Sequence, residues 1–138
     1  MLVSWLGGEP ALWGPLWKVS RTFREEYGLR LGITTHGREL TSPQLRERLI
    51  AWFDRVTVSL DGDAAFHDQV RRSPGLFDRL AAGVSALAEA KARQGYGPLI
   101  HVNTVLMRAN LPLFEQVCET AAAWGAEELT FNNQDLTN

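Results

Sequence analysis

The chain has 138 residues, of which 45% are hydrophobic, 22% charged and 9% aromatic. This is the composition of one globular domain, and it excludes disordered, collagen-like and low-complexity proteins. The formal net charge is −2 and no block of like charges occurs, so nucleic acid is not an expected partner.

Cys118 is the only cysteine, so neither an intrachain disulfide nor a cysteine-rich metal site is expected, and a reducing compartment is favoured. No apolar stretch approaches the roughly 20 residues that span a bilayer, and the first residues lack the basic start and cleavage site of a signal peptide. We therefore expect a cytoplasmic protein with no membrane partner and no metal ligands of its own.

Five extended runs alternate with four stretches of helical periodicity. The strands are expected at Leu2 to Leu6, Leu31 to Thr35, Val56 to Leu60, Leu99 to Leu106 and Leu129 to Phe131. The helices are expected from Pro10 to Tyr27, from Ser42 to Trp52, from Ser73 to about Gly95 and from Asn110 to Gly125. Ser-Pro pairs open two of these helices, and glycines follow three of them. This alternation predicts parallel strands joined by right-handed crossovers, an α/β fold.

Each strand pattern has one apolar and one polar face. In the third run, Val56 and Val58 alternate with Thr57 and Ser59. Strands buried on both faces of a doubly wound sheet are instead almost continuously apolar. We therefore expect a curved sheet with helices on one face and a polar, ligand-binding face on the other. Five strands cannot close a barrel that normally has about eight, so the barrel is expected to be partial and open on one side.

The domain is expected to span residues 1–138 as a single unit. Met1 falls at the start of a strand, and Asn138 falls in a polar loop after another. We therefore expect this domain to be a truncated part of a longer one, with a bare strand edge at its beginning.

The first predicted strand is followed by Gly7-Gly8-Glu9-Pro10. Glycine-rich turns at helix N-termini commonly bind phosphate. Glu9 argues against an anion, because a carboxylate repels phosphate but accepts hydrogen bonds from an ammonium, while glycines let a ligand approach the backbone. The motif predicts a site for an amino group. The alternative is a plain strand-to-helix turn with Glu9 near the cap, which is favoured when the motif stands alone.

The third strand ends in Ser59-Leu60-Asp61-Gly62. Its hydroxyl and carboxylate lie two residues apart, hence on one face, and suit a diol or an ammonium. An Asp-Gly turn with a solvated Asp61 is the alternative. Farther along, Arg71 is interpreted either as a partner for a carboxylate or as a surface residue.

Two other strands contribute polar residues. Thr34-Thr35-His36-Gly37 ends the second strand, and His36 is interpreted as a turn residue. His101 and Asn103 point inward from the fourth strand. His101 is expected to be a hydrogen-bonded core residue, which leaves Asn103 as the better candidate for ligand contact.

Taken together, Gly-Gly-Glu-Pro, Thr-Thr-His-Gly, Val-Ser-Leu-Asp-Gly, His-Asp-x-x-Arg and Val-Asn-Thr-Val resemble, in order and spacing, the core of radical S-adenosylmethionine (SAM) enzymes. The resemblance runs from about Leu2 to Asn133 and is strongest to the branch with molybdenum-cofactor, sulfatase-maturing and peptide-modifying members. It implies a partial (β/α)6 TIM-like barrel comprising strands two to six of the family's core.

The resemblance also implies roles for individual residues. Gly7, Gly8 and Glu9 would hold the methionine amino group of SAM. Ser59, Asp61 and Asn103 would lie near the ribose and methionine ends of SAM. Arg71 would meet the SAM carboxylate, and the backbone around Phe131 would line the adenine. No catalytic residue is assigned.

Two departures from the family's pattern stand out. The three-cysteine loop that binds a [4Fe–4S] cluster would precede Leu2, and Cys118 alone cannot hold a cluster that needs three or four ligands. His36 stands where the family usually has asparagine.

The implied function is therefore that of a fragment of a radical SAM enzyme. The full-length parent would hold the cluster, receive electrons from a donor such as flavodoxin or ferredoxin, cleave SAM reductively to a deoxyadenosyl radical and abstract hydrogen from an unknown substrate. The alternative is a non-catalytic module, a degenerate half-barrel that binds SAM or another amino-acid-like ligand. A phosphate-binding barrel fragment ranks last, because Glu9 opposes it.

Overall fold

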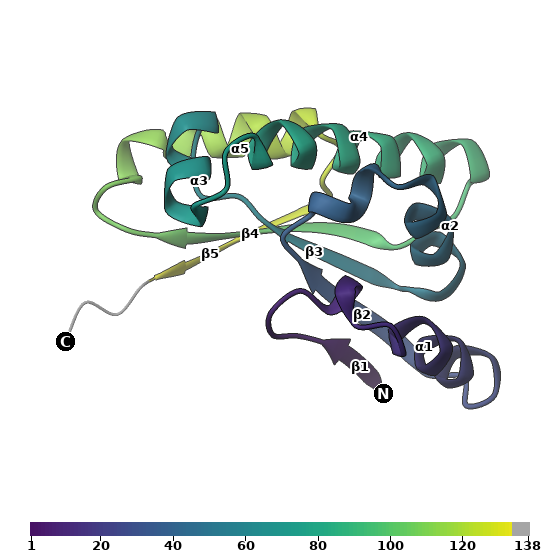
Figure 1. The fold of residues 1–138 in the computed structure, drawn as a ribbon. Coiled ribbons are helices and arrows are strands. Elements are labelled where there is room, and N and C mark those ends of the chain that lie inside the picture. The colour runs from purple at the N-terminus through teal and green to yellow at the C-terminus, as the bar shows by residue number, and fades with distance from the viewer. Residues whose placement is uncertain (134–138) are drawn as a thin grey trace.

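The fold is known from a computed structural model, which describes residues 1–133. Its strands are β1 (Leu2–Trp5), β2 (Arg30–Thr35), β3 (Arg55–Ser59), β4 (Leu99–Leu106) and β5 (Glu128–Asn133). They form one sheet in the order β1-β2-β3-β4-β5, and every neighbouring pair is parallel. The sheet is open, so the predicted α/β fold with a partial barrel is confirmed (Figure 1).

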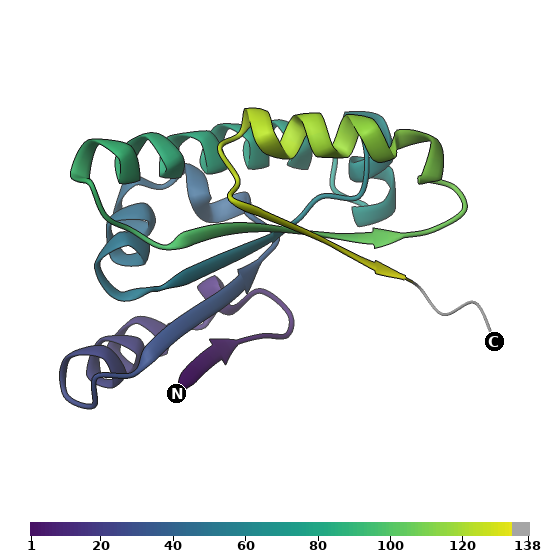
Figure 2. The ribbon, with the colours of Figure 1, turned by 180° about the vertical axis from the view of Figure 1, so that it is seen from behind.

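The helices connect the strands on one side of the sheet. They are α1 (Leu16–Glu25), α2 (Pro43–Trp52), α3 (Ala64–Arg71), α4 (Leu76–Gln94) and α5 (Phe114–Ala123), with the short 3-10 helices η1 (Pro10–Leu12), η2 (Arg38–Thr41) and η3 (Leu111–Leu113). Figures 1 and 2 show α3, α4 and α5 as a layer along the sheet, with β1 and β5 at its opposite edges. No helix within residues 1–133 has the length and apolar character needed to cross a membrane.

Two helices begin later than their periodicity predicts. The helix expected from Pro10 is divided into η1 and α1, and α1 begins only after Pro15, because a proline lacks the N–H that a continuous helix needs. The helix expected from Ser73 begins at Leu76, since Gly75 takes a left-handed φ of +74° immediately before it. The predicted cap at Ser42 is confirmed: its side chain accepts a hydrogen bond from the Leu45 N–H.

Helix α3 was not predicted from the sequence. Its N-cap is Asp63, whose side chain accepts a hydrogen bond from the Phe66 N–H at 2.8 Å. The eight residues of α3 bury only His67 completely, so they lack the apolar stripe by which a helix is recognised. The crossover from β3 to β4 therefore contains two helices.

The sheet has the two different faces that the alternation predicts. Val56, Val58 and Val102 are fully buried, and α4 covers their face with Leu80, Val84 and Leu87. On the opposite face, Thr57 is paired with His101, and Asn103 with Thr130. The apolar core therefore lies between sheet and helices, and the other face is polar.

Close packing holds η2 against α4. A Cβ added to Gly83 in α4 would lie 2.5 Å from the Cβ of Leu40 and 3.0 Å from its carbonyl carbon. Because these are backbone-near atoms, no side-chain rotation relieves the contact. Gly83 is therefore required for this approach, which fixes the turn after β2.

The loops at the amino ends of the strands are built around glycines. Gly28, Gly95 and Gly125, the three predicted helix stops, all have positive φ. Gly95 caps α4 with a φ of +76°, and the next residue, Tyr96, is 61% exposed. These loops lie at the opposite end of the sheet from the turns that carry the candidate site residues.

Candidate functional site

The carboxyl ends of parallel strands share one edge of a sheet. The predicted site residues lie at that edge in three groups: the turn after β1, the buried polar cluster after β3, and the open polar face of β3, β4 and β5.

The turn after β1 presents its backbone to solvent. Gly7 and Gly8 have left-handed φ values of +84° and +55°, both are exposed, and a Cβ on either would have no neighbour within 4 Å. Within residues 1–133, the N–H and carbonyl groups of both glycines make no hydrogen bond. The turn therefore offers free backbone acceptors in open space, as a site for an amino group requires.

Glu9 points away from solvent, toward the end of β2. Its side chain is 4% exposed. Its carboxylate accepts hydrogen bonds from the Ala11 N–H at 3.1 Å, the Thr35 hydroxyl at 2.8 Å and the His36 N–H at 2.9 Å, and His36 Nε2 lies 3.1 Å away. Glu9 thus links the glycine turn to β2, and its predicted contact with the SAM amino group stays a prediction.

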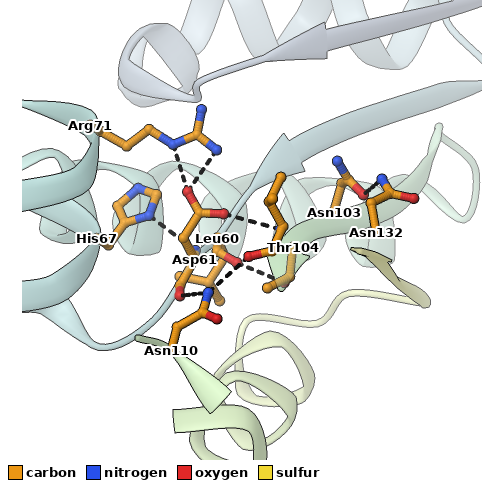
Figure 3. A network of polar contacts seen from close by, with 9 residues as sticks. Leu60, Asp61, His67, Arg71, Asn103, Thr104, Asn110 and Asn132 are labelled. Atoms are coloured by element: carbon orange, nitrogen blue, oxygen red, sulfur yellow. Dashed lines mark hydrogen bonds and ion pairs between the residues drawn. The ribbon is translucent and has the colours of Figure 1, made fainter. Parts of the chain in front are cut away.

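Asp61 and Arg71, both predicted to contact SAM, pair with each other (Figure 3). Nε and Nη2 of Arg71 each lie 2.7 Å from Oδ2 of Asp61, and the Val105 N–H donates to Oδ1 at 3.3 Å. The side chain of Asp61 is 2% exposed and that of Arg71 is 32% exposed. Arg71 reaches Asp61 because it is the last residue of α3, and its predicted role at the SAM carboxylate stays untested.

Two further residues complete the buried cluster. His67 is fully buried, and its Nδ1 accepts a hydrogen bond from the Asp61 N–H at 3.2 Å. Asn110 donates from Nδ2 to the carbonyls of Asp61 at 2.9 Å and Val105 at 2.8 Å, and its Oδ1 accepts from the Met107 N–H at 2.7 Å. Asn110, where the sequence predicts a helix to begin, is the N-cap residue of η3, which leads into α5 at Phe114. Its side chain makes no cap hydrogen bond and instead bridges the ends of β3 and β4.

The open face keeps unused polar groups. Ser59 and Asn103 are opposite each other in register. The side-chain amide of Asn132 donates to Oδ1 of Asn103 at 2.6 Å (Figure 3). Among the described residues, the Ser59 hydroxyl and the Asn103 Nδ2 have no partner. Both are half-buried and remain available to a ligand.

His101 is a hydrogen-bonded residue, as predicted. Its Nδ1 lies 3.0 Å from the Thr57 hydroxyl and its Nε2 lies 2.8 Å from the Thr130 hydroxyl, so the ring joins three strands. Burial, followed by the nearby charge of Arg55, lowers the pKa of His101 from its usual value.

A cavity of about 400 Å³ adjoins the ends of β4 and β5. Leu106, Met107, Leu111, Arg108 and Asn133 line it. The Phe131 side chain instead stacks on Phe114, with 4.5 Å between ring centroids. The predicted role of the Phe131 backbone beside adenine stays a prediction, and the mainly apolar cavity was not found from the sequence.

The described residues hold no metal centre. Within residues 1–133, no group of three His, Cys, Asp or Glu side chains could hold a metal ion. Cys118 is a half-buried free thiol in α5. These residues therefore do not fit a [4Fe–4S] cluster.

Acid is expected to destabilise the fold through His67. Burial lowers the pKa of His67 below its ordinary value of 6.5. The unfolded chain then binds the proton more readily than the folded chain, so the free energy of unfolding falls as pH drops below about 6.5. Urea unfolding between about pH 7.5 and 5 measures this slope.

His67→Asn is the informative variant, because asparagine can still accept from the Asp61 N–H but does not titrate. We expect a shallower slope in His67→Asn, with His101 supplying the remainder. An unchanged slope would contradict this assignment.

Comparison with known proteins agrees with the motifs. No family model matches the sequence. The chain is 30% identical over 129 residues to the AdoMet-dependent heme synthase of Oleidesulfovibrio alaskensis, covering 89% of this chain and 31% of that protein. It is 34% identical over 122 residues to the AdoMet-dependent heme synthase of Methanosarcina barkeri, covering 87% and 33%. The chain thus spans about a third of the length of these relatives.

Solved structures share the fold. Streptococcus suis SuiB bound to S-adenosylmethionine superposes with a TM-score of 0.77 at 18% identity, covering 99% of this chain and 31% of that one. A domain of the pyruvate-formate lyase-activating enzyme from Bacteroides vulgatus superposes with a TM-score of 0.59 at 14% identity, covering 94% of this chain and 98% of that one. These similarities in sequence and in fold support the resemblance to radical SAM enzymes that the motifs indicate, over part of the length of those proteins.

Proposed function

We propose that this chain binds SAM along the carboxyl edge of its sheet and thereby supplies the SAM-holding part of a radical SAM enzyme. The observation that carries the proposal is the turn at Gly7 and Gly8, whose backbone acceptors are unpaired and open within the described residues. An ammonium is the complement of such acceptors, and the methionine end of SAM carries one.

The remaining groups fit the other parts of the same molecule. The unpartnered Ser59 hydroxyl and Asn103 amide lie one and two strands beyond β2, on the open face, and suit the ribose and methionine ends. The apolar cavity at Leu106, Met107 and Leu111, with the Asn133 amide at its wall, suits a purine base. These polar and apolar groups occupy the carboxyl ends of four strands of one sheet, an extended site for an extended ligand.

When bound, SAM would supply an activated sulfonium for reductive cleavage, the chemistry proposed for a protein that also contains the cluster. Cleavage needs the cluster and an electron donor, and the described residues do not fit the cluster. What this chain's own residues contribute is the binding and orientation of SAM. Hydrogen abstraction from a substrate is proposed for a protein that also contains the cluster.

A matched pair of glycine variants tests the binding site. Gly8 and Gly28 have similar φ values, +55° and +63°, and neither would give a new Cβ a neighbour within 4 Å. Alanine at either position costs about 1 kcal/mol of stability, because left-handed backbone is unfavourable for a residue with a Cβ. Only Gly8→Ala places the methyl group where the ligand is proposed to lie, so we expect its affinity for SAM to fall about tenfold or more.

Isothermal titration calorimetry with SAM, methionine and inorganic phosphate measures the effect. Saturable binding of SAM that is weakened by Gly8→Ala and not by Gly28→Ala supports the proposal. Equal effects of the two variants, or tighter binding of phosphate than of SAM, would overturn it.

The lack of fitting cluster ligands in residues 1–133 favours one second candidate, a module that binds SAM without radical chemistry. Anaerobic incubation with iron, sulfide, a reductant and SAM separates the two when it is done on a protein that contains both this chain and cluster ligands. Formation of deoxyadenosine would exclude the non-catalytic module, whereas SAM binding without deoxyadenosine would support it.

A further inference from the structure

Thr35 and His36, where β2 ends and a turn begins, both contact Glu9, and neither was predicted to bind a ligand. Thr35 is 4% exposed. Its hydroxyl donates to Glu9 at 2.8 Å and accepts from the Gly37 N–H at 3.1 Å. His36 approaches Glu9 twice, with its N–H at 2.9 Å and its ring Nε2 at 3.1 Å. The turn therefore surrounds this carboxylate with donors.

The carboxylate of Glu9 is largely occupied by groups of this chain. A carboxylate offers about four acceptor positions. The Ala11 N–H, the Thr35 hydroxyl and the His36 N–H donate to it, the His36 ring Nε2 lies 3.1 Å from it, and the side chain is 4% exposed. An ammonium at the Gly7–Gly8 turn would consequently meet the backbone carbonyls, with Glu9 behind them.

The ring of His36 is itself oriented. Its Nδ1 accepts a hydrogen bond from the Arg38 N–H at 3.4 Å. In the neutral ring this places the proton on Nε2, the nitrogen that faces Glu9. Arg38 begins η2, which Gly83 holds against α4. A continuous path of contacts thus runs from the core helix to the glycine turn.

We propose that His36 is a positioning residue for ligand binding: through Glu9 it fixes the Gly7–Gly8 turn in the conformation that receives the ammonium group of the ligand. The inference rests on the proposed SAM site and names a residue outside the set predicted to contact SAM.

Two measurements test the linkage without any ligand. In the ¹⁵N-histidine-labelled chain, the His36 ring is expected to show a protonated Nε2, because Nδ1 accepts from the Arg38 N–H. The Nε2 chemical shift is expected to change in Glu9→Gln, which replaces the carboxylate beside this nitrogen with a neutral amide. The amides of Ala11 and His36 are expected to exchange with solvent about tenfold faster in Glu9→Gln, since the loss of one hydrogen bond to a charged group has about that effect. Glu25→Gln, at an exposed carboxylate of α1, is the control and should change neither.

Titration with SAM tests the consequence. His36→Ala is expected to weaken SAM binding about tenfold, and His36→Gln, which can again present an N–H at the Nε2 position, is expected to restore most of the affinity. Rescue by glutamine distinguishes positioning from a general loss of folding, as does an unchanged far-ultraviolet circular dichroism spectrum.

The outcomes separate the two proposals. If the wild-type chain binds no SAM, the proposed function fails, while the ring signature and amide exchange still decide the role of His36. A proton on Nδ1, a ring signature unaffected by Glu9→Gln, or SAM affinity within twofold of wild type in His36→Ala would each overturn the inference.

Discussion

Replacing Arg71 with alanine is expected to lower the free energy of unfolding by about 3 kcal/mol, because it leaves a buried carboxylate without its counter-ion. The two short contacts from the guanidinium reach Oδ2 of Asp61, whose side chain is 2% exposed. The loss is placed at the lower end of the range for buried pairs, since Arg71 is itself one-third exposed and partly screened by water. Urea unfolding at neutral pH measures it.

The adjacent Arg72 provides the control. It is exposed and follows α3 with a φ of +51°, and alanine meets the same backbone preference there. Arg72→Ala should therefore change stability by less than about 0.5 kcal/mol. A double-mutant cycle with Asp61→Asn should show coupling between Asp61 and Arg71. Similar losses in Arg71→Ala and Arg72→Ala would show that the pair contributes nothing beyond surface charge.

Asn110→Ala is also expected to lower the free energy of unfolding by about 3 kcal/mol. The reason differs from that for Arg71: the substitution removes three hydrogen bonds of one buried amide, each worth about 1 kcal/mol. The substitution leaves the carbonyls of Asp61 and Val105 and the Met107 N–H without their partner. Asn110 is 2% exposed, so water does not readily replace the amide. Thermal and urea unfolding should agree on the loss.

Asn132→Ala is the matched control for an asparagine that makes one exposed hydrogen bond, to Asn103. We expect Asn132→Ala to lower the free energy of unfolding by less than about 1 kcal/mol. If Asn110→Ala were no worse than Asn132→Ala, the bridging role of Asn110 would be refuted.

The alternation of strands and helices along the chain and the two different faces of the sheet were predictable, because both follow from local periodicity. Val56 and Val58 alternate with Thr57 and Ser59 along the chain, and a parallel sheet converts that alternation directly into an apolar and a polar face. The residues at which the helices begin were harder to predict from the sequence. Helices α1 and α4 begin later than their periodicity predicts because of the backbone conformations at Pro15 and Gly75. Helix α3 has too little apolar periodicity to be recognised.

The candidate site was predictable as a set of residues but not as a set of contacts. Glycines with free backbone groups were found at Gly7 and Gly8, because their chemistry is local to the turn. The partners of Asp61 and Glu9 depended on distant packing: Arg71 is brought to Asp61 by the unpredicted α3, and Thr35 and His36 are brought to Glu9 by the neighbouring strand. Such pairings across elements leave no signature in spacing.

The glycine-containing loops at the amino ends of the strands lie at the opposite end of the sheet from the proposed ligand site. The exposed Tyr96, flanked by Gly95 and Gly97, lies at the far end of β4 from the Met107–Asn110 turn. Changes of length or sequence there act on a surface away from the proposed ligand site. This end is the place to attach a fluorophore or an immobilisation tag, so that binding at the other end can be followed in a chain whose recognition surface is intact.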